Sequence, residues 1–373
     1  MSSHDHAEPT RRVGLWRWIW LAIMIAGAVL AFGVGGIFKP AAPAVILPAE
    51  PAWPSLKFGP VLGQEFFLSN TMASAFIAAL LLAAVVFLVV QPFVRAGSLV
   101  PGGGYQIVEM AIEWLWDQAE AAAGSKWAKD IFPITATIFI VVLTVNLFGL
   151  FPIHETIGYT KVAHGNVQGY HTVNVGGIHL LNGGMPGTEE DEVAANAAAT
   201  AGHEAESHAA EGETAKEAEH YWSSDEACVY CEVVPSLRRA TTDLNFTLAL
   251  AIITMVLIQA MGVRALGLDY FSKFFNLKTI VTKPFFGLMD FIVSLLEMIS
   301  EIAKVLSFSL RLFGNIFAGG LLLAILGSMT VFFVPGLLVG LEVVVGAIQA
   351  YVFSALALTF MSQATVSHSG EGH

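Results

Sequence analysis

The longest apolar stretch of the chain runs from residue 285 to residue 329 and carries Arg311 near its middle. A bilayer core of about 30 Å is crossed by about 20 residues of α-helix, so this stretch is long enough for two passes or for two long tilted helices. The chain as a whole is 55% hydrophobic and only 13% charged, with a mean hydropathy of +0.67. This composition excludes an ordinary soluble protein and predicts an integral membrane protein.

Shorter apolar runs complete the pattern. The run at 16–38 follows a basic N-terminus and is either a retained helix or a cleaved signal peptide, and its length favours the retained helix. The amphipathic segment 105–123 is typical of a helix at the membrane surface. We expect an all-α membrane protein of about six transmembrane helices, two of them long, tilted and near the C-terminus. The remaining runs lie at 71–94, 131–152, 244–262 and 335–361.

Charge is distributed unevenly along the chain. Residues 189–232 hold 13 acids and one lysine, a net charge of −12 that equals the net charge of the whole chain. Basic residues near the ends of the apolar runs recur on one side if the runs alternate in direction, which predicts that this side and the C-terminus are cytoplasmic. Arg238 and Arg239 are a local exception. The basic residues are Arg11, Arg12, Arg17, Arg95, Lys126, Lys129, Arg264, Lys273, Lys278 and Lys283.

The charge pattern also divides the chain. We expect an extra membrane helix and an outer linker in 1–64, the first core helices in 65–152, an outer acidic and His-rich insertion in 153–234, and the last core helices in 235–373. The insertion is Gly-rich up to 187 and an Ala/Glu/His tract from 188 to 220, and we expect neither half to form a packed domain.

The two cysteines of the chain form a C-x-x-C pair inside this insertion. With His208 and His220 nearby, Cys228 and Cys231 are compatible with a metal site or with a disulfide in a solvated acidic loop. The rest of the spacing fits no zinc pattern, so the disulfide is preferred. The chain has no G-x-x-x-x-G-K-[ST] motif for a nucleotide, and we expect no cofactor and no metal.

Arg311 is costly inside a membrane. Estimates for a central arginine range from about 2.5 to about 17 kcal/mol. Ser307, Arg311 and Asn315 stand at i, i+4 and i+8, which places them on one stripe of a helix. We expect the guanidinium to face water, a polar cavity or the acid of a partner; the alternative is a structural ion pair within its own helix bundle.

Further polar residues recur at helical spacing on both sides of Arg311. Glu297, Glu301 and Lys304 stand at i, i+4 and i+7, and Glu342 and Gln349 are seven residues apart on the last helix. Each of these residues alone is compatible with a hydrogen bond between membrane helices. Together they predict two polar stripes that flank one arginine.

Four motifs carry a family resemblance. The segments "SFSLRLFGNIFAGG" at 307–320, "IQAYVF" at 348–353, "VNLFGLFP" at 145–152 and "TTDLNFTLAL" at 241–250 resemble the a subunit of F-type ATP synthase, over residues 65–361 apart from the insertion. The resemblance implies a stator with two proton half-channels against a ring of c subunits, in a bacterial plasma membrane, with ATP chemistry in other subunits. It implies contacts with the c-ring, the b subunits of the peripheral stalk and lipid, and none with nucleic acid. An ion-coupled secondary transporter is the alternative, but it should show related halves, and no internal repeat is visible.

The resemblance also implies roles for individual residues. Arg311 would separate the half-channels and meet the ring carboxylates, with Asn315 beside it and Gln349 reaching it from the last helix. Position 320, where the family often has an acid or histidine, is glycine here, which moves the outer proton relay to Glu342, with His154 and Glu155 at the channel mouth. The residues that match positions in or near the inner half-channel are Ser307, Asp243, Asn245, Glu297 and Lys304.

Overall fold

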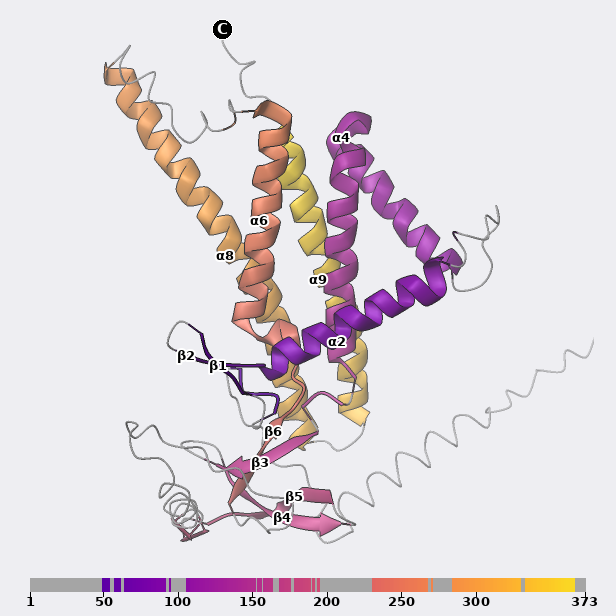
Figure 1. Ribbon diagram of the computed structural model, residues 1–373, viewed down its shortest axis with the longest axis vertical. Helices are drawn as coiled ribbons and strands as arrows, with labels where there is room; N and C mark the ends of the chain where they lie inside the picture. The colour runs from indigo at the N-terminus through magenta and orange to yellow at the C-terminus, as the bar shows by residue number, and fades with distance from the viewer. Residues whose placement is uncertain are drawn as a thin grey trace, which may run out of the picture. The chain divides into compact units, whose positions relative to one another are not determined.

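The computed structural model describes a mostly helical chain (Figure 1). The described residues of 45–159, 233–321 and 339–373 belong to one compact unit, and those of 160–232 and 322–338 belong to a second. The predicted helix at 16–38 lies outside the described residues. The structure describes residues 49–53, 57–61, 64–91, 94, 105–151, 153–155, 157–163, 168–175, 178–188, 190–191, 193–194, 230–267, 270, 284–329 and 333–365.

Five of the described helices are long and apolar enough to cross a membrane, which confirms the prediction of an all-α membrane protein. Helix α2 starts at an N-cap, where the side chain of Ser69 accepts a hydrogen bond from the backbone N–H of Met72. The helices are α2 (Asn70–Val85) with the π-helical turn η1 (Val86–Val90), α4 (Tyr105–Gly149), α6 (Leu244–Leu266), α8 (Pro284–Met329) and α9 (Phe333–Thr365).

Helix α4 consists of two arms, which Figure 1 shows at a clear angle to each other. The break is at Gly124, whose φ of 70° and ψ of 162° only glycine adopts without strain. The first arm contains the segment 105–123 that the sequence predicts as a surface helix. Its Trp114 ring lies 4.9 Å from the ring of Tyr351 on α9, so this arm contacts the last helix.

The long apolar stretch forms one helix. Helix α8 runs unbroken for 46 residues. At about 1.5 Å per residue it is about 69 Å long, roughly twice the thickness of a bilayer core. A single helix of this length favours the interpretation of long tilted helices over that of two separate passes.

Four helices share the main core. The buried residues of α4, α6, α8 and α9 form one cluster that includes Ile138, Ala251, Leu312 and Ala357. Ala251 is 1% exposed and Ala357 is fully buried, and such small side chains let membrane helices approach closely. The aromatic ring of Phe308 fills the remaining space against Phe353, with ring centroids 4.8 Å apart.

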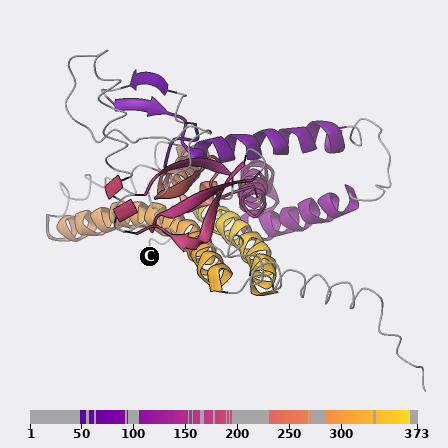
Figure 2. The same cartoon turned by 90° about the horizontal axis from the view of Figure 1, so that it is seen from below.

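The described residues in the first half of the outer insertion form strands with buried side chains, so the prediction that this half forms no packed domain is wrong. Strands β3 (Gly158–Val162), β4 (Tyr170–Val175), β5 (Ile178–Pro186) and β6 (Cys231–Pro235) form a sheet in the order β3-β6-β4-β5, and β1 (Lys57–Val61) pairs with β2 (Gln64–Phe67) elsewhere. Figures 1 and 2 show β4 and β5 side by side. Frequent glycines interrupt the β-branched and aromatic residues that favour strands, so the strands are hard to predict from the sequence. Val162 on β3 and Tyr170 on β4 are buried.

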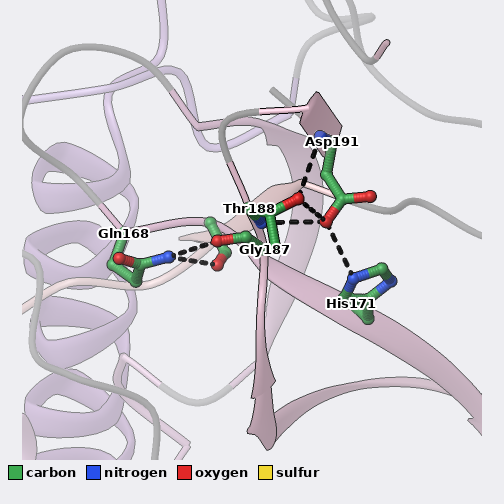
Figure 3. Close-up of polar contacts among 6 residues, drawn as sticks. Gln168, His171, Gly187, Thr188 and Asp191 are labelled. Carbon is green, nitrogen blue, oxygen red and sulfur yellow. Dashed lines mark hydrogen bonds and ion pairs between the residues drawn. The ribbon is translucent and has the colours of Figure 1, made fainter. Parts of the chain in front are cut away.

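Polar contacts connect residues at the ends of the β4–β5 hairpin (Figure 3). The side chain of Asp191 accepts hydrogen bonds of 2.8 Å from both the backbone N–H and the hydroxyl of Thr188, and these bonds lower the pKa of the Asp191 carboxyl. His171 lies 3.3 Å from the same carboxylate. The amide of Gln168 donates to the carbonyl of Gly187 over 3.0 Å. His171 thus belongs to a surface network of the hairpin.

Cys231 is disulfide-bonded, which agrees with the disulfide interpretation and removes this thiolate as a metal ligand. Cys228 lies outside the described residues. No group of three or more potential metal ligands occurs in the described part of the chain.

Candidate functional site

Arg311 lies on an exposed stripe of α8. Ser307, Arg311 and Asn315 are all exposed, while the adjacent residues Phe308 and Leu312 are 5% and 1% exposed and pack into the core. The guanidinium donates one hydrogen bond of 3.3 Å from Nη2 to Oγ of Ser307. Among the described residues, no carboxylate lies within ion-pair distance of Arg311. The arginine is therefore presented on a face of α8 that no other described residue covers.

A first polar cluster lies on the N-terminal side of Arg311 and consists of Gln259, Tyr270, Glu301 and Lys304. The carboxylate of Glu301 accepts a hydrogen bond of 3.2 Å from Gln259 and one of 2.8 Å from Lys304. The Tyr270 hydroxyl donates to Oε1 of Gln259 over 2.5 Å. Burial raises the pKa of Tyr270 to about 12, and the negative charges of Glu301 and Glu297 add to the shift. We call this group the Glu301 cluster.

A second polar cluster, the Glu342 cluster, consists of Asn146, Arg239 and Glu342. The guanidinium Nη1 of Arg239 lies 2.5 Å from Oε2 of Glu342, and the two side chains are only 8% and 11% exposed. Asn146 on α4 donates to the carbonyl of Gly346, one turn beyond Glu342 on α9, over 3.1 Å. The outer acid predicted from the sequence is therefore one half of a buried ion pair.

Glycines make room for this ion pair. A Cβ atom built on Gly149 would lie 3.1 Å from Cγ of Arg239, and one on Gly320 would lie 3.6 Å from its Nη1. A Cβ on Gly319 would lie 3.2 Å from Oε1 of Glu342. The guanidinium of Arg239, which comes from another segment, thus lies next to the space that a side chain at position 320 would enter.

Sequence reasoning missed Arg239 as a site residue. It noticed only that Arg238 and Arg239 break the charge bias of the loops. The two signals that could have found the pair are this exception and the glycine at position 320. Neither signal identifies Glu342 as the partner of Arg239. The two residues are 103 positions apart in the sequence, so no local pattern links them.

His154 lies in the turn after α4. It is 5% exposed, and its Nε2 lies 2.7 Å from the hydroxyl of Ser74 on α2. The ring of Phe148 packs edge-on against it at 4.7 Å. Burial lowers the pKa of His154; a hydrogen bond to the carbonyl of Phe151 opposes this, and the positive charge of Arg239 lowers it further. A buried imidazole held neutral in this way is compatible with the predicted channel mouth, which stays a prediction.

Asp243 caps the N-terminus of α6. Its carboxylate accepts hydrogen bonds from the backbone of Asn245, over 2.9 Å, and from the hydroxyl of Thr71, over 2.8 Å. At about 1.5 Å per residue, the positions from Asp243 to Gln259 extend over about 24 Å. The structure therefore separates Asp243 and Asn245 from the Glu301 cluster, although the family resemblance groups them with Glu297 and Lys304.

Gln349 is 9% exposed and faces the helix bundle. No hydrogen bond joins Gln349 to Arg311 among the described residues, so the predicted contact stays a prediction. Asn315 is exposed on the Arg311 stripe.

These features define a class of protein: a multi-pass helical membrane protein with an arginine exposed between two polar clusters. The chain belongs to the ATP synthase A chain family, whose sequence pattern matches residues 72–362. The match spans most of the chain and includes α6, α8 and nearly all of α9.

Individual relatives agree with this assignment. The chain is 33% identical over 135 residues to the ATP synthase subunit a of Albidiferax ferrireducens, covering 36% of this chain and 54% of that protein. It is 36% identical over 136 residues to the ATP synthase subunit a of Moorella thermoacetica, covering 36% of this chain and 57% of that protein. A third relative, ATP synthase subunit a of Mycobacterium marinum, is 26% identical over 304 residues, 79% of this chain and 86% of that protein. The first two alignments thus span little more than half of the relatives' length.

Proposed function

We propose that the chain is the stator subunit of a rotary F-type ATP synthase and forms two proton half-channels against a ring of c subunits. The observation that carries the proposal is the position of Arg311. Among the described residues it lies exposed on α8, between the Glu301 cluster and the Glu342 cluster. Two polar routes that end on opposite sides of one permanent charge are what a two-channel stator requires.

The chemistry of arginine suits this position. A guanidinium keeps its positive charge where a lysine ammonium can lose its proton, so arginine is the better barrier against proton leakage. An opposite charge within a few ångströms favours the ionised form of a carboxylic acid. A ring carboxylate that passes Arg311 would therefore release its proton there and take up another from the second half-channel.

The two clusters serve as the polar linings of the half-channels in this proposal. Glu301, Lys304 and Glu297 belong to the inner route, and Glu342 is the proton relay of the outer route. The insertion 153–234 then lies outside a bacterial plasma membrane, and the C-terminus lies in the cytoplasm. The charge bias of the loops supports this orientation.

The energy released by each proton is small compared with the energy needed to make ATP, so proton leakage must be prevented. One elementary charge that crosses 100 mV releases about 2.3 kcal/mol, so several protons must be coupled to each ATP. ATP is made on other subunits of the complex. The b subunits would hold this stator still against the moving ring.

The test is ATP-driven acidification of inverted membrane vesicles that contain the complex with Arg311→Ala. We expect pumping to fall at least 100-fold while the chain still co-purifies with the c-ring. Arg264→Ala is the matched control, since Arg264 forms an exposed ion pair with Asp130 and such pairs contribute at most about 1 kcal/mol. Normal pumping by Arg311→Ala complexes would show that the proposal is wrong.

A further inference from the structure

The ion pair between Arg239 and Glu342 joins two segments that are far apart in sequence. Arg239 directly precedes the short 3-10 helix η2 (Ala240–Thr242), and Glu342 lies on α9. The atoms Nη1 and Oε2 are 2.5 Å apart, so the guanidinium donates a short charge-assisted hydrogen bond to the carboxylate. Both side chains are almost completely buried, so neither charge is screened by bulk solvent.

The contacts of the carboxylate are asymmetric. Oε2 of Glu342 is held by Arg239, whereas Oε1 is buried and has no hydrogen-bond partner among the described residues. Nε of Arg239 and Oδ1 of Asn146 are also buried without a partner in the described part of the chain. The cluster thus combines one fixed carboxylate oxygen with a second that is available for another hydrogen bond.

A purely structural ion pair explains these contacts less well. Replacing a buried ion pair with packed apolar side chains is often neutral or stabilising, so packing alone does not require two charges here. A structural pair would also be expected to engage both carboxylate oxygens and the remaining guanidinium hydrogens. Gly149, Gly319 and Gly320 instead lie directly against the two side chains, where added Cβ atoms would come within 3.1, 3.2 and 3.6 Å of them.

We propose that Arg239 is the positioning residue of the outer proton relay: it holds Oε2 of Glu342 and leaves Oε1 as the atom that carries the proton. This inference rests on the proposed function. A proton from the outer side binds to Oε1 and neutralises the carboxylate, and the same proton then passes to a ring carboxylate, which restores the charge of Glu342. No other bond forms or breaks. Arg239 stays charged throughout and acts only by fixing the acid.

The position of Arg239 also accounts for Gly320. Because Nη1 of Arg239 lies 3.6 Å from the place of a Cβ atom on Gly320, a long side chain at position 320 and the arginine would compete for one space. The positive charge of Arg239 reaches His154 as well, where it helps to lower the pKa of the imidazole. Arg239 therefore stands between the turn after α4 and Glu342.

The experiment measures ATP-driven acidification by inverted vesicles that contain the whole complex. The variants are Arg239→Gln, Arg239→Lys, Glu342→Gln and the double variant Arg239→Gln/Glu342→Gln, with Arg264→Gln as the control. Complex assembly is checked by the amount of c-ring that co-purifies with each variant. We expect Arg239→Gln to lower the initial rate at least fivefold, and Arg239→Lys to keep at least half of it.

The double variant separates relay positioning from a structural role. We expect it to pump at the rate of Glu342→Gln alone, because the arginine has no relay left to position. A double variant that regains the wild-type rate would show that the pair is only structural and would overturn the inference. A wild-type rate for Arg239→Gln beside a slow Glu342→Gln would overturn it and leave the proposed function standing. A wild-type rate for Glu342→Gln would overturn the relay itself.

A steric variant tests the same inference with both charges kept. Gly320→Leu directs a large side chain at the guanidinium of Arg239, whereas a Cβ atom on Gly340 would meet nothing within 4 Å. We expect Gly320→Leu to slow pumping at least threefold and Gly340→Leu to leave it unchanged. If Arg239→Gln complexes fail to assemble, this variant decides: a wild-type rate for assembled Gly320→Leu complexes would contradict the inference.

Discussion

The hydroxyl oxygens of Thr247 on α6 and Ser309 on α8 lie 3.1 Å apart and share a hydrogen bond. Both residues are almost fully buried, at 0% and 1% exposure. Twelve positions further along α6, Gln259 donates to Glu301 on α8. The two contacts show that α6 and α8 run antiparallel, and they fix which part of α6 lies beside Arg311.

We expect Thr247→Val to lower the free energy of unfolding by about 1 kcal/mol, because the Ser309 hydroxyl loses its cross-helix partner while the shape is kept. The measurement is the thermal unfolding of the purified complex in detergent. The double variant Thr247→Val/Ser309→Ala should lose less than the sum of the two single changes. Strictly additive losses would show that the hydroxyl pair does not couple the helices.

Tyr270 predicts a pH dependence of stability at the Glu301 cluster. Burial, Glu301 and Glu297 raise its pKa from 10.0 to about 12, so the folded protein keeps the phenol neutral where the unfolded chain ionises it. The stability that Tyr270 contributes is therefore complete below pH 10 and is lost as the pH rises from 10 to about 12. Thermal unfolding across this range should show the loss in the wild type and a weaker dependence in Tyr270→Phe. Equal slopes in the two proteins would exclude this role for Tyr270.

Close packing between α6 and Tyr270 predicts opposite effects for two glycine substitutions. A Cβ atom on Gly262 would lie 2.4 Å from Cε2 of the Tyr270 ring, so Gly262→Ala must displace the ring and its hydrogen bond to Gln259. We expect a loss of about 1–3 kcal/mol. Gly340→Ala meets no atom within 4 Å and should be neutral or stabilise α9 by up to about 1 kcal/mol. Chemical denaturation of both variants makes the comparison, and equal stabilities would contradict it.

His154 predicts a second pH dependence, with the opposite sign. Its pKa lies below the ordinary value of 6.5, because burial and Arg239 disfavour the imidazolium. The stability contributed by the neutral imidazole is present above pH 6.5 and is lost as the pH falls below this value, where the unfolded chain takes up the proton. Thermal unfolding of the wild type between pH 7.5 and pH 5 should show this loss, and His154→Gln should show less of it. An unchanged acid slope in His154→Gln would remove His154 as its source.

The sequence predicted the helices and the Arg311 stripe because both depend on local periodicity. An apolar run of helix length and a polar residue at every fourth position can be read without knowing which helices are neighbours. Ser307, Arg311 and Asn315 therefore share a face as predicted. The same reasoning identified Glu301 and Lys304, which pair within one helix at i and i+3.

The sequence did not predict the contacts that depend on tertiary structure. The pairing of Arg239 with Glu342 is set by how the segment before η2 meets α9, which no periodicity encodes. Asp243 was grouped with Lys304, but Asp243 caps the N-terminus of α6, whereas Lys304 on α8 pairs with Glu301, which contacts Gln259 sixteen positions further along the chain. The sheet was missed because frequent glycines around β4 hide the alternation in which Tyr170 and Thr172 share one face of the strand.

The central claim is that Arg311 seals the boundary between two half-channels, and passive proton leakage tests it most directly. Inverted vesicles containing the complex are given a potassium diffusion potential without ATP, and proton entry is followed with a pH-sensitive dye. We predict that Arg311→Ala vesicles leak protons at least tenfold faster than vesicles with Arg264→Ala, and that they do not pump when ATP is added. Arg311→Ala vesicles that stay proton-tight and pump at the normal rate would contradict the account.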